Sequence, residues 1–376
     1  MINGHGDDRH CYSPTIHTDF SSNVWFGGTP PELISHLQQN LHLIGNYPEP
    51  DAVALRLQLA ESHSVEINQV LAFNGSVEAF YTIALAFSKS VSAILVPAFT
   101  EYEDACRMHQ HIPMFFRNDE AEIVLDSGTN LFWIGNPNNP DGLIFSFQKI
   151  EQWLCKHPNI VFVIDEAYAA FIPEFQSTIS LTRSYSNLIV VRSLTKCCAI
   201  PGLRLGYVVT SDKLADRLRK FQQPWSVNAL AQESGKFLID YLEEHPLNTT
   251  MILQLSLDLQ RSVSQLDGFQ VIPAEAPFFL VEIQSGIAAE LKKFLIEKHQ
   301  VLIRDASNFR GLNERYFRVC TRDKSDNQLL MGGLIDWSTG NTITDSPHAR
   351  SLGHSPSLHV ERGRGESANT LAFKIE

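Results

Sequence analysis

The amino-acid sequence predicts an α/β protein with a large domain, built on a mainly parallel sheet between helices, and a smaller α/β domain. Short apolar runs rich in Val, Ile and Phe recur over about residues 68–212, and longer amphipathic stretches separate several of them. Such runs suit strands that are covered by helices on both faces. They are SAILVPAF (92–99), LFWIGNP (131–137), IVFVIDEAY (160–168), NLIVVRS (187–193) and LRLGYVV (203–209).

A second α/β stretch covers about residues 250–336 and contains FFLVEI (278–283) and RYFRVCTR (315–322). We expect it to form the smaller domain. After Trp337 the sequence is rich in Ser, His and Gly and shows no clear terminal helix, which is typical of an irregular or disordered tail. The predicted segments are therefore an N-terminal arm (1–47), the large domain (48–235), the small domain (236–337) and the tail (338–376).

The composition disfavours several classes of partner. A formal net charge of −12 over 376 residues disfavours nucleic acid and anionic membranes. No apolar run approaches the roughly 18 residues that a membrane-spanning helix requires, and the N-terminus is polar. The six cysteines lack the spacing of metal ligands or of a disulfide framework. We therefore expect a protein of the reducing cytoplasm without a metal site.

One lysine, Lys196, follows a predicted strand in VVRSLTKCCAIPGLRLGYVV (190–209). A lysine at the end of a strand is ordinarily a solvated charge. Here Ser193, Thr195 and Arg204 lie close to it in the sequence, and two hydroxyls and a forked cation are groups that bind a phosphate. Lys196 is therefore a candidate for covalent chemistry, which requires a pocket that lowers the pKa of the amine.

A second anion site is predicted in VLAFNGSVEAFYTIALAF (70–87), a pattern of strand, tight turn and helix. Asn74 and Gly75 occupy the turn and Ser76 begins the helix, whose free N–H groups and dipole attract phosphate. Taken alone, the same residues also describe an ordinary turn followed by an N-cap.

Asp165 ends an apolar strand, where an unpaired carboxylate would be costly. It either caps the next helix or faces a cation. Lys196 lies one strand unit further along, which places both residues at the same edge of the sheet. A carboxylate that faces a pyridinium nitrogen and a lysine joined to the aldehyde of the same ring together describe a site for pyridoxal phosphate.

Four motifs carry a resemblance to a known family. NPNNPDG (136–142), DEAY (165–168), SLTK (193–196) and GLRLGY (202–207), in this order, resemble fold-type I pyridoxal-phosphate enzymes of the histidinol-phosphate aminotransferase group. The similarity covers about residues 17–330. Within that group, DFSSN (19–23), QQPWSVNALA (222–231) and residues 190–209 and 301–322 are most similar to the threonine-phosphate decarboxylases, which make the aminopropanol phosphate linker of cobalamin. A seven-stranded sheet is implied.

The resemblance also implies roles at the cofactor. Lys196 would bind its aldehyde covalently, Asp165 would keep its pyridine nitrogen protonated, and Tyr168 and Asn139 would contact the ring hydroxyl. Tyr102 would stack on the ring face, where the alternative is a core aromatic. The residues implied at the cofactor phosphate are Asn74, Gly75, Ser76, Ser193, Thr195, Arg204 and, from the neighbouring subunit of a homodimer, Tyr47.

The substrate implied is a small phosphorylated amino acid. Arg318 would pair with its α-carboxylate, and Arg304 and Arg322 are candidates for its phosphate. The other substrate contacts implied are His5 and Gly6 of an N-terminal GHGDD loop, Asn23 and Asn139. Two features depart from the family pattern: Asp141 stands where threonine is usual, and Cys197 and Cys198 follow the lysine where an aromatic residue is common.

Three functions stay open at this point. The first is decarboxylation of L-threonine O-3-phosphate to (R)-1-amino-2-propanol O-2-phosphate and CO2, with pyridoxal phosphate as cofactor. The second is an aminotransferase acting on histidinol phosphate or a related amino acid. The choice depends on substrate orientation, which Arg318, Arg304, Arg322 and the N-terminal loop would set. The third is a catalytically silent binding protein, against which the intact Lys196, Asp165 and Arg204 argue.

Overall fold

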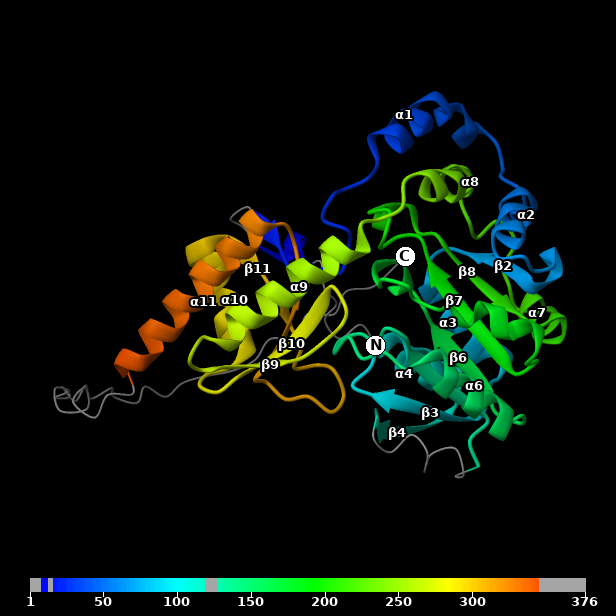
Figure 1. Cartoon of the computed structure of the whole chain (residues 1–376). Coiled ribbons are helices and arrows are strands. Elements are labelled where there is room, and N and C mark those ends of the chain that lie inside the picture. The colour runs from blue at the N-terminus through cyan, green and yellow to red at the C-terminus, as the bar shows by residue number, and fades with distance from the viewer. Residues whose placement is uncertain (1–7, 13–15, 119–127, 345–376) are drawn as a thin grey trace, which may run out of the picture.

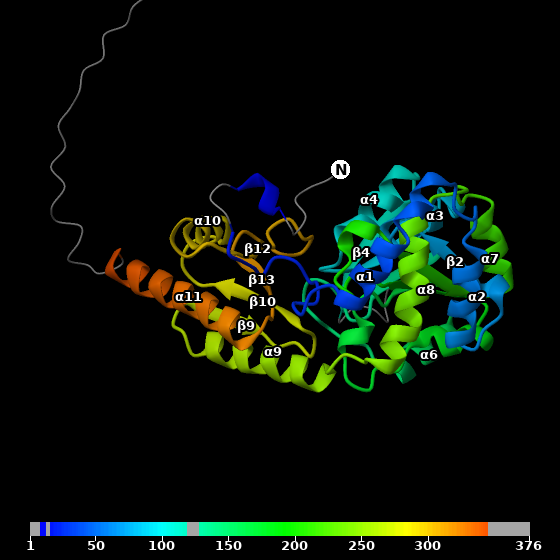
Figure 2. The ribbon, with the colours of Figure 1, turned by 90° about the horizontal axis from the view of Figure 1, so that it is seen from above.

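The computed structural model describes residues 8–12, 16–118 and 128–344. The chain forms two lobes that lie side by side (Figures 1 and 2). The larger lobe contains most of the chain up to helix α8 (Ala229–Glu244), and the smaller lobe begins with helix α9 (Thr249–Ser264). Residues 345–376, the greater part of the predicted tail, lie outside the described residues.

The larger lobe is built on a seven-stranded sheet with the order β2-β8-β7-β6-β5-β3-β4. Strand β8 runs antiparallel to both its neighbours, and the pairs from β7 to β4 are parallel. The strands are β2 (Val70–Phe73), β3 (Val91–Val96), β4 (Ile112–Arg117), β5 (Leu131–Gly135), β6 (Val161–Asp165), β7 (Leu188–Ser193) and β8 (Gly206–Thr210). The predicted mainly parallel sheet is confirmed.

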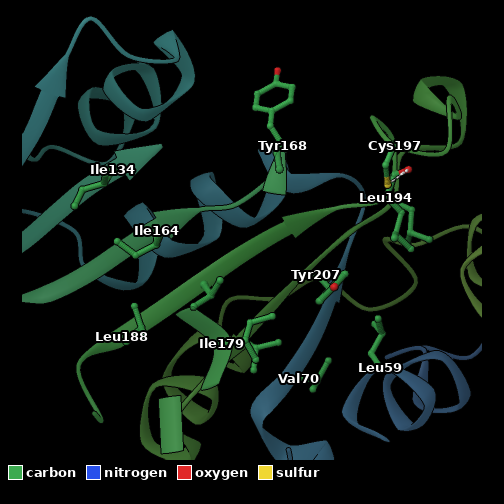
Figure 3. Close-up of a cluster of buried hydrophobic side chains, with 14 of the residues drawn as sticks. Leu59, Val70, Ile134, Ile164, Tyr168, Ile179, Leu188, Leu194, Cys197 and Tyr207 are labelled. Carbon is green, nitrogen blue, oxygen red and sulfur yellow. Dashed lines mark hydrogen bonds between the residues drawn. The ribbon is translucent and has the colours of Figure 1, made fainter. Parts of the chain in front are cut away.

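Helices cover both faces of this sheet because successive side chains of its strands point to opposite faces. In β6, Phe162 and Ile164 pack toward one layer and Val163 toward the other, and each is almost fully buried. The first layer contains α2 (Val53–Ser62), α6 (Phe147–Lys156) and α8. The second contains α3 (Ser76–Ala86), α4 (Thr100–Met108) and α7 (Asp212–Arg219). Figure 3 shows part of the first layer.

The smaller lobe contains an antiparallel sheet with the order β12-β13-β10-β9 and a separate core. Its strands are β9 (Phe269–Ile272), β10 (Phe278–Ile283), β12 (Arg304–Asp305) and β13 (Tyr316–Cys320). Helices α9, α10 (Ala288–His299) and α11 (Lys324–Thr344) pack against it.

The N-terminal arm joins both lobes. Its strand β1 (Thr18–Asp19) pairs in parallel with β11 (Val301–Leu302) of the smaller lobe. Its helix α1 (Pro31–Gln39) lies on the larger lobe, where His36 Nε2 is 2.8 Å from Glu233 Oε1 on α8. The segment between them crosses the interface between the lobes, where the predicted site residues gather.

The structure corrects the prediction for the C-terminal region. The sequence shows no clear terminal helix, yet α11 begins at Lys324 and continues through Trp337 to Thr344. It is held by tertiary packing, since Leu330 and Leu334 are fully buried in the core of the smaller lobe. The other predicted boundaries, at residues 47 and 235, stay predictions. Among the described residues, no helix is both long and apolar enough to span a bilayer.

Candidate active site

The turn after β2 and the ends of β8 and β7 meet at one edge of the sheet. Gly206 on β8 lies opposite both Phe73 on β2 and Ser193 on β7. A Cβ atom on Gly206 would lie 2.5 Å from the backbone nitrogen of Ser76 and 2.8 Å from the carbonyl carbon of Gly75. The turn at residues 74–76 therefore approaches β8 as closely as only a glycine allows, and it brings the N-terminus of α3 beside β7.

Arg204 and two hydroxyl groups complete this cradle. Gly75, at φ +82°, lies directly against Arg204, because a Cβ there would be 2.5 Å from Nη2. Arg204 itself has φ +58°, a left-handed conformation that is uncommon outside glycine and is concentrated at functional sites. Ser193 Oγ and Thr195 Oγ1 lie 2.7 Å apart and are buried. The structure thus brings together the six residues of this chain that are predicted at the cofactor phosphate. They are Asn74, Gly75, Ser76, Ser193, Thr195 and Arg204.

Asp165 lies at the end of β6 with its carboxylate buried. The Tyr102 hydroxyl donates to Oδ2 at 2.6 Å, and the backbone N–H of Ala167 donates to Oδ1 at 3.0 Å. Burial raises the pKa of the Asp165 carboxyl to about 6, against the opposing effects of these hydrogen bonds and of the positive charge of Lys196. The carboxylate and the lysine are therefore close enough to interact electrostatically.

Tyr102 packs as a core aromatic in this structure. Its ring stacks on Trp133 with centroids 5.9 Å apart and meets Phe80 edge-on at 5.0 Å. Burial raises the pKa of its hydroxyl well above the usual value, so the group stays a proton donor toward Asp165. Stacking of Tyr102 on a cofactor ring stays a prediction.

Lys196 lies in the turn that follows β7 and is partly buried. The N-terminal arm contacts this turn, because the backbone N–H of Trp25 donates to the Lys196 carbonyl at 2.9 Å. The Thr29 hydroxyl donates to the Ala199 carbonyl at 2.6 Å. The lysine is thus positioned both by the sheet and by a segment more than a hundred residues earlier in the chain.

Tyr168 follows β6 and is a buried member of the apolar cluster of the first layer (Figure 3). Its ring meets Phe278 of the smaller lobe edge-on, with centroids 4.7 Å apart. Burial raises the pKa of its hydroxyl to about 12, and the positive charge of Arg318 and the Asn23 side chain oppose that rise. Among the described residues, the buried side-chain Nδ2 and Oδ1 of Asn23 have no partner at good hydrogen-bond geometry. Such atoms point to a bound polar group.

Arg318, on β13, joins the two lobes. Its Nη1 donates to Asn139 Oδ1 of the NPNNPDG motif, and its Nη2 donates to the Ser21 carbonyl of the N-terminal arm. Both acceptors are neutral, and the buried Nε has no partner among the described residues. Burial lowers the pKa of this guanidinium. Arg318 is therefore a buried cation with capacity to bind an anion.

Arg304, on β12, lies directly opposite Arg318 in the strand register. Its Nη1 donates to the Asp305 carbonyl and its Nη2 to Asn308 Oδ1, both at 2.7 Å. Burial lowers the pKa of Arg304 to about 10, and the charge of Arg318 acts in the same direction, while nearby Asp8 opposes it. The charge of the Asp305 carboxylate raises this pKa too, so Arg304 is a buried cation that interacts with Arg318 and with acidic groups.

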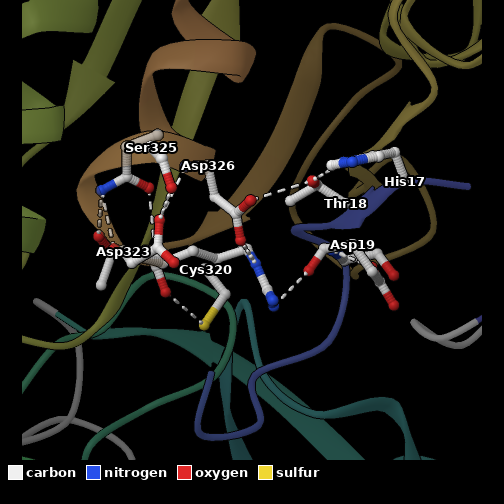
Figure 4. A network of polar contacts seen from close by, with 11 residues as sticks. His17, Thr18, Asp19, Cys320, Asp323, Ser325 and Asp326 are labelled. Atoms are coloured by element: carbon white, nitrogen blue, oxygen red, sulfur yellow. Dashed lines mark hydrogen bonds and ion pairs between the residues drawn. The ribbon is translucent and has the colours of Figure 1, made fainter. Parts of the chain in front are cut away.

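Arg322 is engaged differently from the other two arginines. Its Nε donates to Asp326 Oδ2 at 2.7 Å and its Nη1 to the Asp19 carbonyl at 3.1 Å (Figure 4). It lines a separate cavity of about 320 Å³ together with Arg9, His17 and Trp25. Of the two predicted phosphate contacts, Arg304 thus lies beside Arg318, while Arg322 is held by a carboxylate.

The remaining predicted residues lie elsewhere. Tyr47 is 87% exposed, and its ring is 5.6 Å from that of Trp225. His5 and Gly6 lie outside the described residues. Asp141, the departure from the family motif, closes its own turn, since its Oδ1 accepts from Asn138 Nδ2 at 2.7 Å and from the Leu143 N–H at 3.1 Å.

Sequence reasoning missed several contributors to this region. The Ser21 carbonyl and the Trp25 N–H act through the backbone, so their residue types give no signal. Asn308, which accepts from Arg304, lies in a loop with no motif of its own. Gly206 could have been found, because a glycine inside a predicted strand indicates a close backbone approach.

A family model for aminotransferases of class I and II matches residues 15–334. This match covers most of the chain, and the fold and site described above agree with it. The chain therefore belongs to the aminotransferase class I and II family. The enzymes of this family depend on pyridoxal phosphate, and this protein is a pyridoxal-phosphate-dependent enzyme.

Individual proteins of this family are similar to the chain over most of its length. Threonine-phosphate decarboxylase of Salmonella typhimurium is 31% identical over 345 residues, which are 89% of this chain and 94% of the relative. The crystal structure of L-threonine-O-3-phosphate decarboxylase from Porphyromonas gingivalis is 40% identical, with a TM-score of 0.83, and the match covers 85% of this chain and 99% of that one. Histidinol-phosphate aminotransferase 1 of Mannheimia succiniciproducens is 27% identical over 82% of this chain and 86% of the relative. The resemblance predicted from the motifs is confirmed.

The residues present fit pyridoxal phosphate. The cradle leaves no room for a Cβ atom at Gly75 or Gly206, and it offers a helix N-terminus, hydroxyls and a guanidinium, which suit a phosphate. The buried Asp165 carboxylate, with a pKa raised by burial, suits a cationic pyridine nitrogen. Lys196 lies close enough to Asp165 to act on the same ring.

A substitution of Gly206 tests this cradle. In Gly206→Ala, the added methyl would meet backbone atoms of Ser76, Gly75 and Arg192 within 3.0 Å, so the turn must move away from β8. We expect an affinity for pyridoxal phosphate at least about tenfold weaker, which corresponds to roughly 1.4 kcal/mol. The measurement is a titration of the cofactor-free protein, followed by absorbance.

Gly202→Ala is the matched control. Gly202 lies in the same segment, and a Cβ there has no neighbour within 4 Å. We expect this variant to bind the cofactor as the unmodified protein does. Equal cofactor affinity in the Gly202 and Gly206 variants would contradict the proposed cradle.

Proposed function

We propose that this enzyme decarboxylates L-threonine O-3-phosphate, releasing CO2 and (R)-1-amino-2-propanol O-2-phosphate, a step that the family resemblance connects to cobalamin biosynthesis. The observation that carries this proposal is the buried pair of Arg304 and Arg318, which lie directly opposite in the register of β12 and β13. L-Threonine phosphate carries two anionic groups on a short skeleton, so its charge and size match two neighbouring guanidinium groups. The similarity to threonine-phosphate decarboxylases over most of the chain supports the same choice.

The roles at the cofactor are part of this proposal. Lys196 holds the cofactor covalently, Asp165 keeps its pyridine nitrogen protonated, and Tyr168 and Asn139 contact its ring hydroxyl. The residues at the end of β7 and at the start of α3 hold its phosphate. When bound, pyridoxal phosphate supplies an electron-withdrawing ring that stabilises the negative charge left on the substrate Cα.

The protein's own residues then select the bond that breaks. Arg318, fixed by Asn139 and the Ser21 carbonyl, binds the α-carboxylate, and Arg304 binds the phosphate. These two anchors would fix the orientation of the bond between Cα and the carboxylate, whose electrons would remain on Cα as CO2 leaves. Lys196 then supplies the proton that Cα takes up.

The N-terminal loop is proposed to close over the substrate. His5 and Gly6 belong to this loop, and Asp8 at its described end lies near Arg304, whose pKa its charge raises. Asp8 Oδ2 also accepts from Lys292 Nζ of the smaller lobe at 2.5 Å. These contacts of Asp8 support the proposal.

Variants of the two arginines test the assignment. We expect Arg304→Gln to raise KM for L-threonine phosphate at least about tenfold, because a charge-assisted contact of roughly 1.5–3 kcal/mol is removed. The same variant should bind free L-threonine, which lacks the phosphate, about as weakly as the unmodified enzyme does. Steady-state kinetics with both compounds measure the difference.

Arg322→Gln is the control for that experiment, because Arg322 is paired with Asp326 in this structure. We expect its KM for L-threonine phosphate to rise less than that of Arg304→Gln. A larger effect at Arg322 than at Arg304 would assign the substrate phosphate to Arg322 and would refute the proposed division of roles.

A second candidate is an aminotransferase acting on histidinol phosphate or a related amino acid. The similarity to a histidinol-phosphate aminotransferase over 82% of the chain favours it. Arg318 would then bind the carboxylate next to the oxo group of 2-oxoglutarate, or that of a related amino acid, and Lys196 would move a proton from Cα. Histidinol phosphate itself carries one anionic group, so the facing arginine pair fits it less well than it fits L-threonine phosphate.

We also propose that the active unit is a homodimer to which each subunit contributes Tyr47 at the partner's cofactor phosphate. Tyr47 is 87% exposed, and it lies near other exposed apolar side chains: Leu41, Ile44 and Trp225. Exposed apolar patches that contain aromatic residues are typical of protein interfaces. A cytoplasmic location for this dimer stays a prediction.

Mixed dimers test the shared site. We expect Lys196→Ala and Tyr47→Ala proteins, each weak alone, to recover activity when their subunits are exchanged. One site of each mixed dimer then combines an intact Lys196 with an intact Tyr47. Activity is measured at a cofactor concentration that saturates the unmodified enzyme but not Tyr47→Ala. If mixing restores no activity beyond the sum of the two separate proteins, Tyr47 does not act across the interface.

A further inference from the structure

Two adjacent thiols lie in the turn that carries Lys196. Cys197 and Cys198 follow the lysine directly, and their Sγ atoms are 3.5 Å apart. They are 3% and 2% exposed. The proposed function gives neither thiol a role. Two thiols in contact next to a lysine that binds a cofactor are a candidate site of modification.

A small cavity reaches one of the two thiols. Cys197 lines a cavity of about 170 Å³ together with Arg192, His63 and Tyr207. The Cys197 side chain lies beside Leu194, in the apolar cluster that also contains Leu59 and Tyr207 (Figure 3). This volume admits a molecule of the size of hydrogen peroxide, since the share of one water in the liquid is about 30 Å³.

The Cys198 thiol and the Arg192 guanidinium act on the pKa of the Cys197 thiol. The hydrogen bond with Cys198 and the positive charge of Arg192 lower the pKa of the Cys197 thiol, against the opposing effect of burial. The Arg192 guanidinium is fixed there by an ion pair of 2.9 Å with Glu166. A thiolate beside a fixed cation is the usual environment of a reactive cysteine. The hydrogen bond with Cys197 and burial raise the pKa of the Cys198 thiol.

We propose that Cys197 and Cys198 form a peroxide-sensitive dithiol, which closes reversibly to a disulfide between adjacent residues and thereby displaces Lys196. The Cys197 thiolate attacks one oxygen of hydrogen peroxide, the O–O bond breaks, and the sulfur becomes a sulfenic acid while hydroxide leaves. The Cys198 sulfur then attacks the Cys197 sulfur and expels the second oxygen as water. Both thiol protons end in water, so that one peroxide and two thiols give one disulfide and two waters.

General geometry indicates that this disulfide is easily reduced. Adjacent Cα atoms lie about 3.8 Å apart across a trans peptide, whereas disulfides usually join Cα atoms about 4.4–6.8 Å apart. A bond closed outside that range is strained, and strained disulfides have more oxidising potentials. The modification therefore fits a reversible response better than a permanent cross-link.

Ring closure must also move the lysine. The two sulfur atoms have to approach from 3.5 Å to about 2.05 Å, which requires rotation of the turn. That turn is held by hydrogen bonds from Trp25 N–H to the Lys196 carbonyl and from Ile200 N–H to the Thr195 carbonyl. Both bonds flank the segment that rotates, so oxidation alters the position of Lys196 relative to Asp165.

The experiment uses the full chain with Cys11→Ser and Cys155→Ser, because these two exposed thiols would react first. The cofactor-loaded protein is treated with hydrogen peroxide, and the peptide with residues 197–198 is analysed by mass spectrometry without prior reduction. We expect it to lose two hydrogen atoms and to gain no oxygen, and dithiothreitol to reverse the change. Retention of both thiols, or gain of oxygen without loss of two hydrogens, would overturn the proposal.

The effect on the cofactor is measured in the same samples. We expect oxidation to weaken the retention of pyridoxal phosphate at least about tenfold by absorbance after dialysis, and reduction to restore it. Cys197→Ser and Cys198→Ser should keep the cofactor under the same treatment. Disulfide formation without cofactor loss would refute the link to Lys196. Loss of the cofactor in both serine variants would assign the peroxide effect to another group, such as Cys320.

Discussion

Replacing Lys196 with alanine is expected to abolish turnover and the covalent attachment of pyridoxal phosphate. Lys196 provides the amine that holds the cofactor and the proton that Cα takes up in the proposed reaction. Loss of a positioned proton donor alone typically costs about 10²–10⁴ in rate, and loss of the covalent anchor adds to it. We therefore expect kcat to fall at least about a thousandfold. The readouts are product formation and the visible absorbance of the purified protein.

Lys213→Ala serves as the matched control, because Lys213 is exposed on α7. It should retain the cofactor and full activity. Cofactor binding by Lys196→Ala through the phosphate cradle alone is expected to be weak and reversible on dialysis. A Lys196→Ala protein that keeps covalently bound cofactor would contradict the assignment of this lysine.

Asp165→Asn is expected to cause the second large loss, about a thousandfold in kcat, an amount that corresponds to roughly 4 kcal/mol in the transition state. The asparagine keeps the size of the side chain and can still accept from Tyr102. It lacks the negative charge that keeps the pyridine nitrogen protonated. Asp240→Asn, an exposed change on α8, is the control and should leave kcat unchanged.

Asp165→Asn lowers kcat, but we expect it not to lower the folding stability of the cofactor-free protein at neutral pH. Burial raises the pKa of Asp165 from 3.8 to about 6, so the folded state binds this proton more tightly than the unfolded state does. The contribution of Asp165 to stability is therefore largest below pH 4 and is lost as the pH rises toward 6. A shift of this size corresponds to about 3 kcal/mol.

Denaturant unfolding of cofactor-free protein at pH 4.5 and pH 7 checks this consequence. The unmodified protein should lose more stability between the two values than Asp165→Asn does. At pH 7 the variant should unfold at a denaturant concentration no lower than that of the unmodified protein, despite its loss of activity. A variant that is markedly less stable at pH 7 would contradict the cost assigned to the buried carboxylate.

The positions of Asp165 and Ser193 at one edge of the sheet could be predicted from sequence. Each follows a short run of buried apolar residues, and the carboxyl ends of parallel strands meet at one edge. The same reasoning places Lys196 and the turn at residues 74–76 nearby. These predictions need only the order of the strands and the handedness of their connections.

Features that depend on tertiary contacts could not be predicted in this way. Helix α11 lacks a strong apolar pattern near its end, and it is held by packing on the smaller lobe. Arg322 precedes α11, and its ion pair with Asp326 in the first turn of that helix depends on how the turn folds. Strand β4, at the edge of the large sheet, is only partly buried and so gives a weak apolar signal.

Specific polar contacts join the two lobes, and no sequence motif predicts these contacts. Arg318 reaches Asn139 across the interface, and Arg310 makes a bidentate ion pair with Glu103 on α4 at 2.8 and 2.7 Å. These contacts hold the smaller lobe, which carries Arg304 and Arg318, against the larger one. In the proposed reaction these arginines orient the substrate, so we expect the choice of bond to depend on lobe placement.

The central claim is that this site decarboxylates a phosphorylated amino acid. The most direct measurement incubates the enzyme and pyridoxal phosphate with L-threonine O-3-phosphate and, separately, with histidinol phosphate and 2-oxoglutarate, while CO2 and glutamate are followed independently. We predict one CO2 for each L-threonine phosphate consumed, with aminopropanol phosphate as the other product, and no glutamate. Formation of glutamate from histidinol phosphate, without CO2 from L-threonine phosphate, would contradict this account.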